Sequence, residues 1–311
     1  MEPEDEEVVK GRVKTRDVKS TRYQTCKVLN RLVGKCPTGL VILIAQGQKF
    51  QAEEHSMNLR AITVNLGGGG PTATKYKTAA DEWAKQVRQE RTLDLLCVQE
   101  VHDDDWLEAW RAKGWDVVVG SGPIYKPRSA IIANFPIESF PYPTSDYHGS
   151  YVAVAQVKSG AADGWLIASV HASPTALSAD WVKRWVSCGL ERPVPRTGLE
   201  LWDSDLVLAS MRSLAERGPL IVAGDWNEAR NWDFGHGGVA GKEFFEGVEA
   251  AGFVDCAFRE WKAEKPTHGT YQLDHVFASK NVADQVEVHS APGEKISDHA
   301  PIAFEVLLND N

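Results

Sequence analysis

The sequence has no long run of apolar residues. The longest uninterrupted apolar stretch near the start runs from Leu40 to Ala45, whereas a helix that crosses a membrane needs about 20 apolar residues in a row. We therefore expect no membrane-spanning helix and no membrane partner. The first seven residues are acidic apart from Met1 and Pro3, whereas a secretory signal begins with basic residues. This start predicts an intracellular, cytoplasmic protein.

Cysteine is scarce, and its positions suggest no pairing. The five cysteines are scattered, and no two of them have the Cys-x-x-Cys spacing. An odd and dispersed set argues against a disulfide-stapled scaffold and against a structural zinc site. The glycine run at residues 67–70 lacks the Lys-Ser/Thr of a phosphate-binding loop and the spacing of a dinucleotide fingerprint. We interpret it as a flexible turn.

Positive charge is also in deficit. The net charge is −9, but residues 1–56 carry ten lysines and arginines against eight acidic residues, so residues 57–311 carry −11. An acidic surface repels polyanions at long range, which argues against passive coating of nucleic acid. It leaves open an enzyme in which a bound metal ion supplies positive charge locally.

Two regions of the chain differ in composition. Residues 1–56 contain none of the eleven tryptophans, and we expect an accessory or poorly ordered N-terminal extension there. Residues 57–311 have the patterns of one catalytic domain. Because Met57 lies just before the first predicted strand, a start of translation at Met57 is an open alternative.

Apolar runs predict many strands and few helices. The predicted strands are 59–65, 94–99, 115–120, 130–134, 151–158, 165–171, 220–224, 273–278, 285–289 and 302–307. Helical spacing is present at 74–91, 103–113 and 205–217. Because so few helices separate the strands, the strands cannot all be parallel. We predict stacked sheets with helices outside, an α/β (α+β) sandwich.

Polar side chains lie at the ends of several predicted strands. The end of a strand holds a side chain in a fixed position next to a loop, which suits a catalytic site. Each position alone has a plain structural explanation as a surface carboxylate, a turn former or a local hydrogen-bonding motif. The complete set in this order favours a catalytic cleft. The set is Asn65, Gln99-Glu100, His171, Asp225 with Asn227, Asp274-His275 and Ser297-Asp298-His299.

These segments resemble the endonuclease/exonuclease/phosphatase superfamily, which has the deoxyribonuclease I-like fold. The most specific pieces are Gly224-Asp225-Trp226-Asn227 and Ser297-Asp298-His299-Ala300-Pro301, and the resemblance runs from about Met57 to Leu308. It implies a four-layer sandwich of two packed mixed or antiparallel β-sheets flanked by helices, with the site at one rim. It also implies a metal-dependent hydrolase that cleaves phosphate esters with Mg²⁺, or alternatively Mn²⁺, as cofactor.

The resemblance implies roles for individual residues. Glu100 is similar to the principal Mg²⁺ ligand of the family, with Asn65 beside it and Asp298 at a second metal position. The remaining matches handle water, phosphate oxygens and protons. Asp225 and Asn227 resemble the pair that orients water and phosphate, His299 the active-site histidine, Asp274 its carboxylate partner, and His171 a second histidine found in some branches.

One stretch departs from the family pattern. Tyr125-Lys126-Pro127-Arg128 is similar to a Tyr-Lys-Glu-Arg stretch of deoxyribonuclease I, so Pro127 replaces the carboxylate expected to pair with His171. Arg128 is either a substrate phosphate contact or a charge at a strand edge. We interpret His275 as structural, and residues 174–203 as either a substrate wall or a helix and loop that bury their own tryptophans.

Three functions stay open at this level. The leading hypothesis is a nuclease-type phosphodiesterase that acts, as a monomer, on nucleic acid or on a small phosphate ester. The first alternative is a phosphatase or phospholipase-type enzyme for inositol phosphates or phospholipids. The acidic surface favours small substrates, and the lack of an amphipathic membrane segment disfavours lipid. The second alternative, a catalytically silent binding module, has no reason to keep this set of residues.

Overall fold

The computed structural model describes residues 58–67, 93–102, 104–121, 127–142, 150–196, 201–231, 240–290 and 297–308. The chain divides into the units Met1–Glu53 and Glu54–Asn311, and all described residues belong to the second unit. The expectations for residues 1–56, for the helix at 74–91 and for glycines 68–70 lie outside the described residues. Within the described ranges, no helix is long and apolar enough to cross a membrane.

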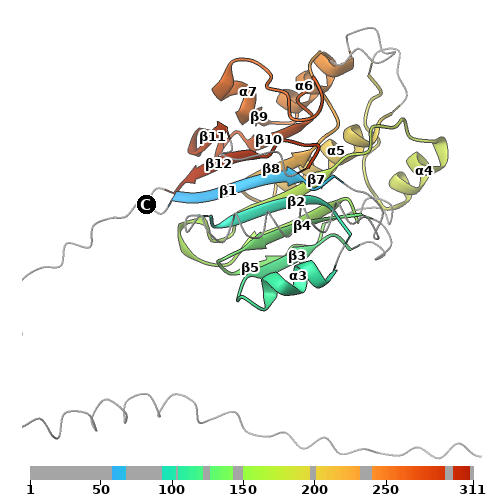
Figure 1. Cartoon of the computed structure of the whole chain (residues 1–311). Coiled ribbons are helices and arrows are strands. Elements are labelled where there is room, and N and C mark those ends of the chain that lie inside the picture. Colours follow the sequence, from blue (N-terminus) through green and yellow to red (C-terminus); the bar gives the residue numbers. More distant parts are fainter. Residues whose placement is uncertain are drawn as a thin grey trace, which may run out of the picture. The chain divides into compact units, whose positions relative to one another are not determined.

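The described residues form two six-stranded sheets (Figure 1). The first sheet has the order β11 (Val286–Ser290), β12 (Ile302–Leu307), β1 (Asn58–Asn65), β2 (Leu95–Val101), β4 (Arg128–Ala133), β3 (Asp116–Val119). The second has the order β5 (Ile137–Ser139), β6 (Val152–Val157), β7 (Leu166–His171), β8 (Leu220–Asp225), β10 (Asp274–Ser279), β9 (Phe253–Asp255). Only the β1–β2 and β7–β8 pairs are parallel. The prediction that the strands cannot all be parallel is confirmed.

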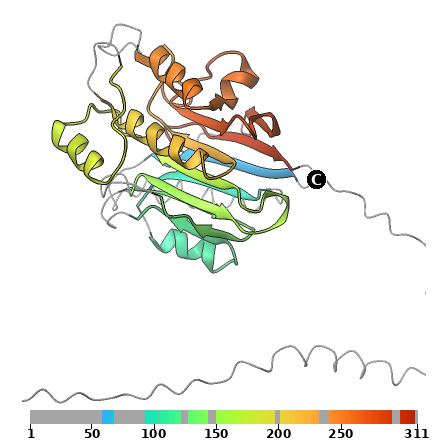
Figure 2. The ribbon, with the colours of Figure 1, turned by 180° about the vertical axis from the view of Figure 1, so that it is seen from behind.

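Helices cover the outer face of each sheet, as Figures 1 and 2 show from opposite sides. On the first sheet lies α3 (Asp104–Arg111), which buries Trp106, Leu107 and Trp110. On the second lie α5 (Asp203–Ala215) and α6 (Ala240–Ala250). The other helical elements are α4 (Ala179–Ser187), α7 (Cys256–Trp261) and 3-10 turns at Gly160–Ala162 and Ala283–Gln285. The predicted four-layer sandwich is confirmed.

Successive side chains of one strand pack in different layers of the sandwich. In β1, Ala61 packs in the core between the two sheets, whereas Ile62 and Val64 pack with α3 on the outside. In β2, Leu95 and Leu96 divide in the same way. Because successive side chains point to opposite faces, a strand covered on both faces reads as a continuous apolar run. This is why the central strands were predictable.

Two strands and two helices have no counterpart in the sequence prediction, in which α4 corresponds to the helix of the packing alternative for residues 174–203. β5 and β9 have three residues each, which is too short for alternation to be detected. α7 has six residues and glycine interrupts α6, so neither shows a long helical pattern in the sequence, although Asp255 caps α7 by accepting a hydrogen bond from the Phe258 amide. Tertiary packing, not local periodicity, defines these elements.

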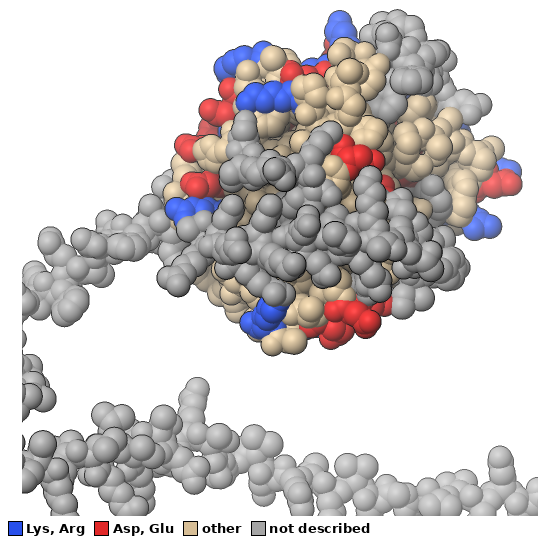
Figure 3. Space-filling view, in the orientation of Figure 1, with Lys and Arg blue, Asp and Glu red and all other residues tan. Residues whose placement is uncertain are grey.

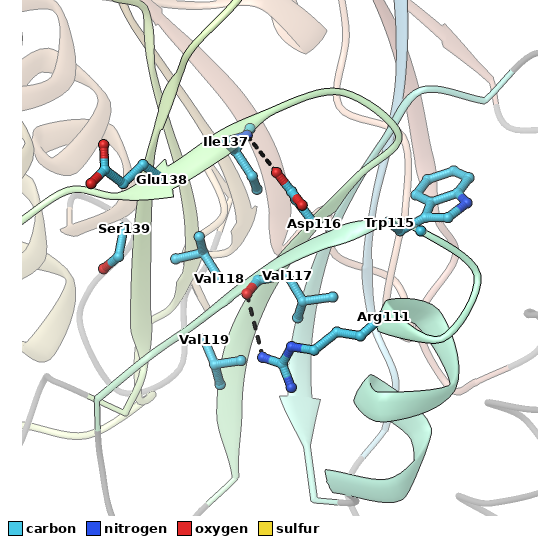
Figure 4. Close-up of a pocket in the computed structure, with 10 residues that line it drawn as sticks. Arg111, Trp115, Asp116, Val117, Val118, Val119, Ile137, Glu138 and Ser139 are labelled. Atoms are coloured by element: carbon cyan, nitrogen blue, oxygen red, sulfur yellow. Dashed lines mark hydrogen bonds between the residues drawn. The ribbon is translucent and has the colours of Figure 1, made fainter. Parts of the chain in front are cut away.

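The edge strands β3 and β5 border a cavity of about 720 Å³ (Figure 4). Here Arg111 donates a hydrogen bond to the carbonyl of Val117 at 3.3 Å, and Asp116 accepts one from the Ile137 amide at 3.0 Å. These contacts satisfy backbone groups of the two edge strands that would otherwise be free to pair with another strand. None of the motif residues of the sequence analysis lines this cavity, so it is separate from the candidate site.

Candidate active site

The motif residues meet at one rim of the sandwich because both parallel pairs end there. In the register of the strands, Asn65 lies opposite Gln99 at the end of β1–β2, and His171 lies opposite Asp225 at the end of β7–β8. The antiparallel β10 starts at the same edge, with Asp274 opposite Asp225. Each sheet therefore contributes part of the site.

Two non-glycine residues at this rim have left-handed backbone conformations. Glu100 has φ of 56° and Asn227 has φ of 50°. The register of β2 against β4 shifts between Val98 and Val101, so Glu100 lies in a bulge, a device that redirects a side chain. Such conformations cost about 1–3 kcal/mol each and cluster at functional sites. Glu100 and Asn227 are thus held in place by the surrounding fold.

Gly224 allows β8 to approach β7 closely just before Asp225. Its φ is 152°, and a Cβ atom there would lie 2.0 Å from the carbonyl oxygen of Val170. No other residue type fits without moving the strands apart. The glycine of the Gly-Asp-x-Asn motif is therefore required by packing next to the site.

Asn65 connects the carboxylates of the two sheets. Its Nδ2 donates hydrogen bonds to Glu100 Oε1 at 3.0 Å and to Asp225 Oδ2 at 2.8 Å, and its Oδ1 accepts one from the Gly67 amide at 2.9 Å. The side chain is almost fully buried. Asn65 lies beside Glu100 as expected, and its contacts are those of a group that positions both carboxylates.

His299 forms a dyad with Asp274. Nδ1 of His299 lies 2.8 Å from Asp274 Oδ2, and both residues are buried. Burial alone would lower the pKa of His299, but the hydrogen bond and charge of Asp274, with the charges of Asp225 and Asp298, raise this pKa to about 9. Nε2 of His299 lies 3.9 Å from Asp225 Oδ2. At neutral pH, His299 therefore presents a proton toward Asp225.

Asp225 is the central carboxylate of the site. Its burial, together with the charge of Asp274, raises its pKa above the usual value, whereas the charges of His171 and His299 and the hydrogen bond from Asn65 oppose this rise. Its Oδ1 accepts a hydrogen bond from the Asn227 amide at 2.9 Å. A carboxylate with a raised pKa is a better proton acceptor, which suits a group that activates water.

His171 faces the same carboxylates from the other side. Its Nε2 lies 3.4 Å from Glu100 Oε1 and 3.8 Å from Asp225 Oδ2, and its ring contacts Tyr151 edge to face. Its Nδ1 is buried and has no hydrogen-bond partner among the described residues. This agrees with Pro127 standing where the resemblance implies a carboxylate partner.

Three further site residues differ in their surroundings. Asn227 belongs to the cluster, and its Nδ2 donates to the carbonyl of Ala172 at 2.8 Å. Arg128 lies opposite Val101 at the edge of the site and forms an ion pair with Asp104 of α3. The half-exposed Asp298 has its Oδ2 3.6 Å from His268 Nε2. The ion pair of Arg128 is thus with a side chain outside the cluster, whereas Asp298 lies between His268 and the cluster residue His299.

A buried polar layer under the site was missed by the sequence analysis. Gln99 Nε2 donates to Ser169 Oγ at 2.9 Å and to Thr63 Oγ1 at 3.3 Å, which links the two sheets. Thr63 and Ser169 lie two residues before Asn65 and His171, on the same face of their strands. Polar residues at this spacing within apolar strands were the signal that could have identified the layer.

The donor set suits a hard divalent cation. Asp225 and Asp274 are buried, and His171 and His299 are their only ion-pair partners within the described part of the chain. Oδ1 of Asp274 is buried and lacks a hydrogen-bond partner among the described residues. Together with Glu100, the site has three carboxylates against two histidines in these contacts, and carboxylate and amide oxygens are ligands that Mg²⁺ prefers. The residues therefore fit such an ion.

The described residues of the segment 174–203 are anchored next to the site. Trp185 of α4 is 1% exposed, and Trp181 stacks with Arg184 at 4.8 Å. Arg196 is buried and forms hydrogen-bonded ion pairs with Asp205 and with Glu228, the residue after Asn227. These contacts support the packing interpretation for Trp185.

Comparison with known proteins agrees with this geometry. The model of the Endonuclease/Exonuclease/phosphatase family matches residues 62–299. The chain belongs to this family. Its name covers enzymes that cleave phosphate esters, and membership supports a phosphoester hydrolase. No curated protein matches the sequence.

Solved structures with the same fold include members of this family with low sequence identity. An AP endonuclease from Archaeoglobus fulgidus is 16% identical with a TM-score of 0.55, covering 79% of this chain and 98% of that one. The 3′ phosphatase NExo from Neisseria, bound to a product DNA hairpin, is 16% identical with a TM-score of 0.57, covering 80% and 99%. The AP endonuclease LMAP from Leishmania major is 14% identical with a TM-score of 0.55, covering 80% and 88%. These likenesses show the deoxyribonuclease I-like fold.

Proposed function

We propose that this chain is a Mg²⁺-dependent phosphodiesterase of nuclease type that cleaves a phosphate ester bond by attack of water. The observation that carries the proposal is the convergence of two histidines on one buried carboxylate. Nε2 of His171 and Nε2 of His299 lie 3.8 Å and 3.9 Å from Asp225 Oδ2. Membership of the family supports the phosphoester class of the reaction.

Glu100 would hold the metal ion, and Asn65 would orient its carboxylate from the adjoining strand. A bound Mg²⁺ ion neutralises charge on the phosphate and makes a bound water more acidic. Glu100 is suited to this role because it lies at the rim in a partly exposed bulge, whereas Asp225 and Asp274 are buried. Mn²⁺, which prefers the same oxygen ligands, would substitute.

Protons would move between Asp225 and the histidines. Asp225 Oδ2 would accept the proton of the attacking water, because both histidine Nε2 atoms face this oxygen at 3.8 Å and 3.9 Å. His299 is protonated at neutral pH, since its pKa is raised to about 9, and would stabilise the negative charge that grows on the phosphate oxygens. His171 would contact the opposite side of the phosphate.

Short substrates suit the surface better than long polyanions. Residues 57–311 carry a net charge of −11. On the face in Figure 3, the described basic and acidic side chains are intermixed and form no continuous basic track. This observation favours a second candidate function, a phosphatase for a small phosphorylated substrate. Arg128 is the proposed substrate contact in both cases.

A substrate panel tests the proposal. Plasmid DNA, abasic duplex, RNA, nucleotides, inositol phosphates and a bis-aryl phosphodiester would each be incubated with Mg²⁺ and with EDTA. We expect Mg²⁺-dependent cleavage of a diester, which Asp225→Asn should slow by about two to four orders of magnitude. Cleavage of monoesters only would favour the phosphatase, and no turnover of any substrate would support a silent binding module. Light scattering of the same sample tests whether the active form is a monomer.

A further inference from the structure

A second group of metal-binding side chains lies next to the catalytic cluster. It consists of His268, Asp298 and His299, and we refer to it as the His268 cluster. The potential ligand atoms of these three side chains all lie within 4.8 Å of one another. His268 belongs to none of the motifs in the sequence, and the proposed function gives it no role.

The backbone holds His268 and His299 side by side. The two residues form an antiparallel bridge, and the adjacent Ala300 amide donates to the Thr267 carbonyl at 2.7 Å. Ser297 also holds the segment that carries His299. Its Oγ accepts a hydrogen bond from the His299 amide at 2.9 Å and donates one to the Asn65 carbonyl at 2.6 Å. The positions of the two histidines are therefore fixed by main-chain contacts and do not depend on a flexible loop.

The side chains converge on one point at the rim. The rings of His268 and His299 lie 4.6 Å apart at an angle of 32°. Asp298 Oδ2 lies 3.6 Å from His268 Nε2. Because Asp274 already occupies Nδ1 of His299, only Nε2 of that ring is available to a ligand. A carboxylate on the far nitrogen is the usual partner of a metal-bound histidine, since it fixes the tautomer and the ring orientation.

We propose that the His268 cluster binds a transition-metal ion of the Zn²⁺ type, at a site distinct from the Mg²⁺ site at Glu100. Imidazole ligands favour Zn²⁺ and related ions, whereas Mg²⁺ prefers oxygen ligands only. Three protein ligands plus an open position is a common arrangement for zinc. The ligand atoms would close to about 3.3 Å, the spacing around a tetrahedral zinc. The side chains of His268 and Asp298 are 43% and 54% exposed, so both have room to move.

Occupancy of this site would switch the enzyme off. A zinc ion on Nε2 of His299 would occupy the ring atom that lies 3.9 Å from Asp225 Oδ2 and would face the phosphate. Zn²⁺ would therefore inhibit even when Mg²⁺ is saturating, because the two ions share no ligand. This consequence rests on the proposed function, whereas the binding itself does not.

Binding is measured first, without reference to activity. The full chain with saturating Mg²⁺ is titrated with Zn²⁺ by calorimetry and with Co²⁺ by visible absorption. We expect His268→Gln to weaken Zn²⁺ binding at this site at least tenfold and to remove the tetrahedral Co²⁺ signal. His289→Gln, a change of an exposed histidine on β11, is the matched control and should bind like the unmodified chain. All five cysteines remain in every variant, so adventitious thiol binding cancels in the comparison.

The result that overturns the proposal is equally clear. If His268→Gln binds Zn²⁺ as the unmodified chain does, or if Mg²⁺ displaces the zinc, then His268 and Asp298 form only an ordinary ion pair. Inhibition is tested next: Zn²⁺ should inhibit the unmodified chain and His289→Gln, while His268→Gln keeps its Mg²⁺-dependent activity in Zn²⁺. A chain that is active with Mg²⁺ but binds no Zn²⁺ refutes this inference alone. A chain that binds Zn²⁺ through His268 but hydrolyses nothing refutes the proposed function alone.

Discussion

The two histidines that face Asp225 are held in different ways. His299 has a buried carboxylate on its far nitrogen, which raises its pKa to about 9. His171 lies at nearly the same distance from Asp225, but its far nitrogen has no hydrogen-bond partner among the described residues. Two histidines at nearly the same distance from Asp225 therefore differ in how firmly their rings are held. A histidine becomes a dependable proton carrier only when a second group fixes its ring.

The largest expected effects are on the His299 side of this comparison. His299→Ala and Asp225→Asn should each reduce kcat by about two to four orders of magnitude, because each removes a charge or a proton-transfer group at the phosphate. His171→Ala should reduce kcat by about one to two orders, since Nδ1 of this ring has no hydrogen-bond partner among the described residues. Steady-state kinetics on the substrate found in the panel measures all three. Equal losses of kcat for His299→Ala and His171→Ala would contradict the proposed difference between the two histidines.

Glu100, on the His171 side, tests metal binding. Glu100→Gln should weaken Mg²⁺ binding by at least about tenfold, because a neutral amide is a poorer ligand than a carboxylate. The melting temperature in metal-free buffer should change little, since Glu100 is partly exposed and in a strained conformation. Calorimetric Mg²⁺ titration and thermal melts measure the two effects. A large drop in melting temperature would mean that Glu100 is structural.

A third histidine has a carboxylate partner but no access to substrate. His275 is fully buried, with Nε2 donating to the Glu228 carbonyl at 2.9 Å and Nδ1 3.5 Å from Asp255 Oδ2. Burial alone would lower the pKa of His275, but the hydrogen bond and charge of Asp255 raise it. Burial likewise opposes ionisation of Asp255, but contacts with His275, the Phe258 amide and Arg230 lower its pKa.

The pair predicts a pH window for stability. The contribution of His275 is complete below its unfolded pKa of about 6.5 and is lost as pH rises through the higher folded pKa, whereas that of Asp255 is lost as pH falls below about 4. His275→Gln should therefore destabilise most between about pH 4 and 6.5, by about 1–3 kcal/mol, and less at higher pH. Urea unfolding at pH 6 and pH 9 measures this difference. A pH-independent loss, or a loss of turnover at unchanged stability, would contradict a structural role.

Pro127 offers a way to make His171 resemble His299. Pro127→Glu restores the residue type that the resemblance places opposite His171, and it should raise the pKa of that ring and increase kcat severalfold. NMR titration of His171 and kinetics together measure the change. Pro127→Gln is the control without a charge, and it should leave both quantities unchanged. An identical response to both substitutions would show that the carboxylate does not reach the ring.

The smallest expected effect concerns residues 1–56, which we propose are accessory to the catalytic domain. A chain of residues 57–311 should keep its unfolding cooperativity and its activity within about twofold. Denaturant unfolding and kinetics on both lengths measure this. Aggregation of the shorter chain, or a loss of several kcal/mol, would show that the apolar stretch from Leu40 to Ala45 belongs to the fold.

The sequence by itself determined the central strands and singled out the polar residues that end them. The strands were predictable because layers cover both of their faces, and this leaves continuous apolar runs that end in polar residues, as at Asn65 and His171. The short elements β5, β9 and α7 were not predictable, since packing rather than periodicity defines them. The resemblance named the chemistry of the site, but it did not reveal the polar layer of Gln99, Thr63 and Ser169.

Only the tertiary structure decided which of those residues contact one another. Asn65 and Asp225 are 160 residues apart, yet they share a hydrogen bond of 2.8 Å because two parallel strand pairs end at one rim. The same convergence places a carboxylate on Nδ1 of His299 and places His268 beside His299, whereas Nδ1 of His171 has no hydrogen-bond partner among the described residues. A one-dimensional pattern records which side chains exist, whereas pKa and metal preference depend on which of them touch.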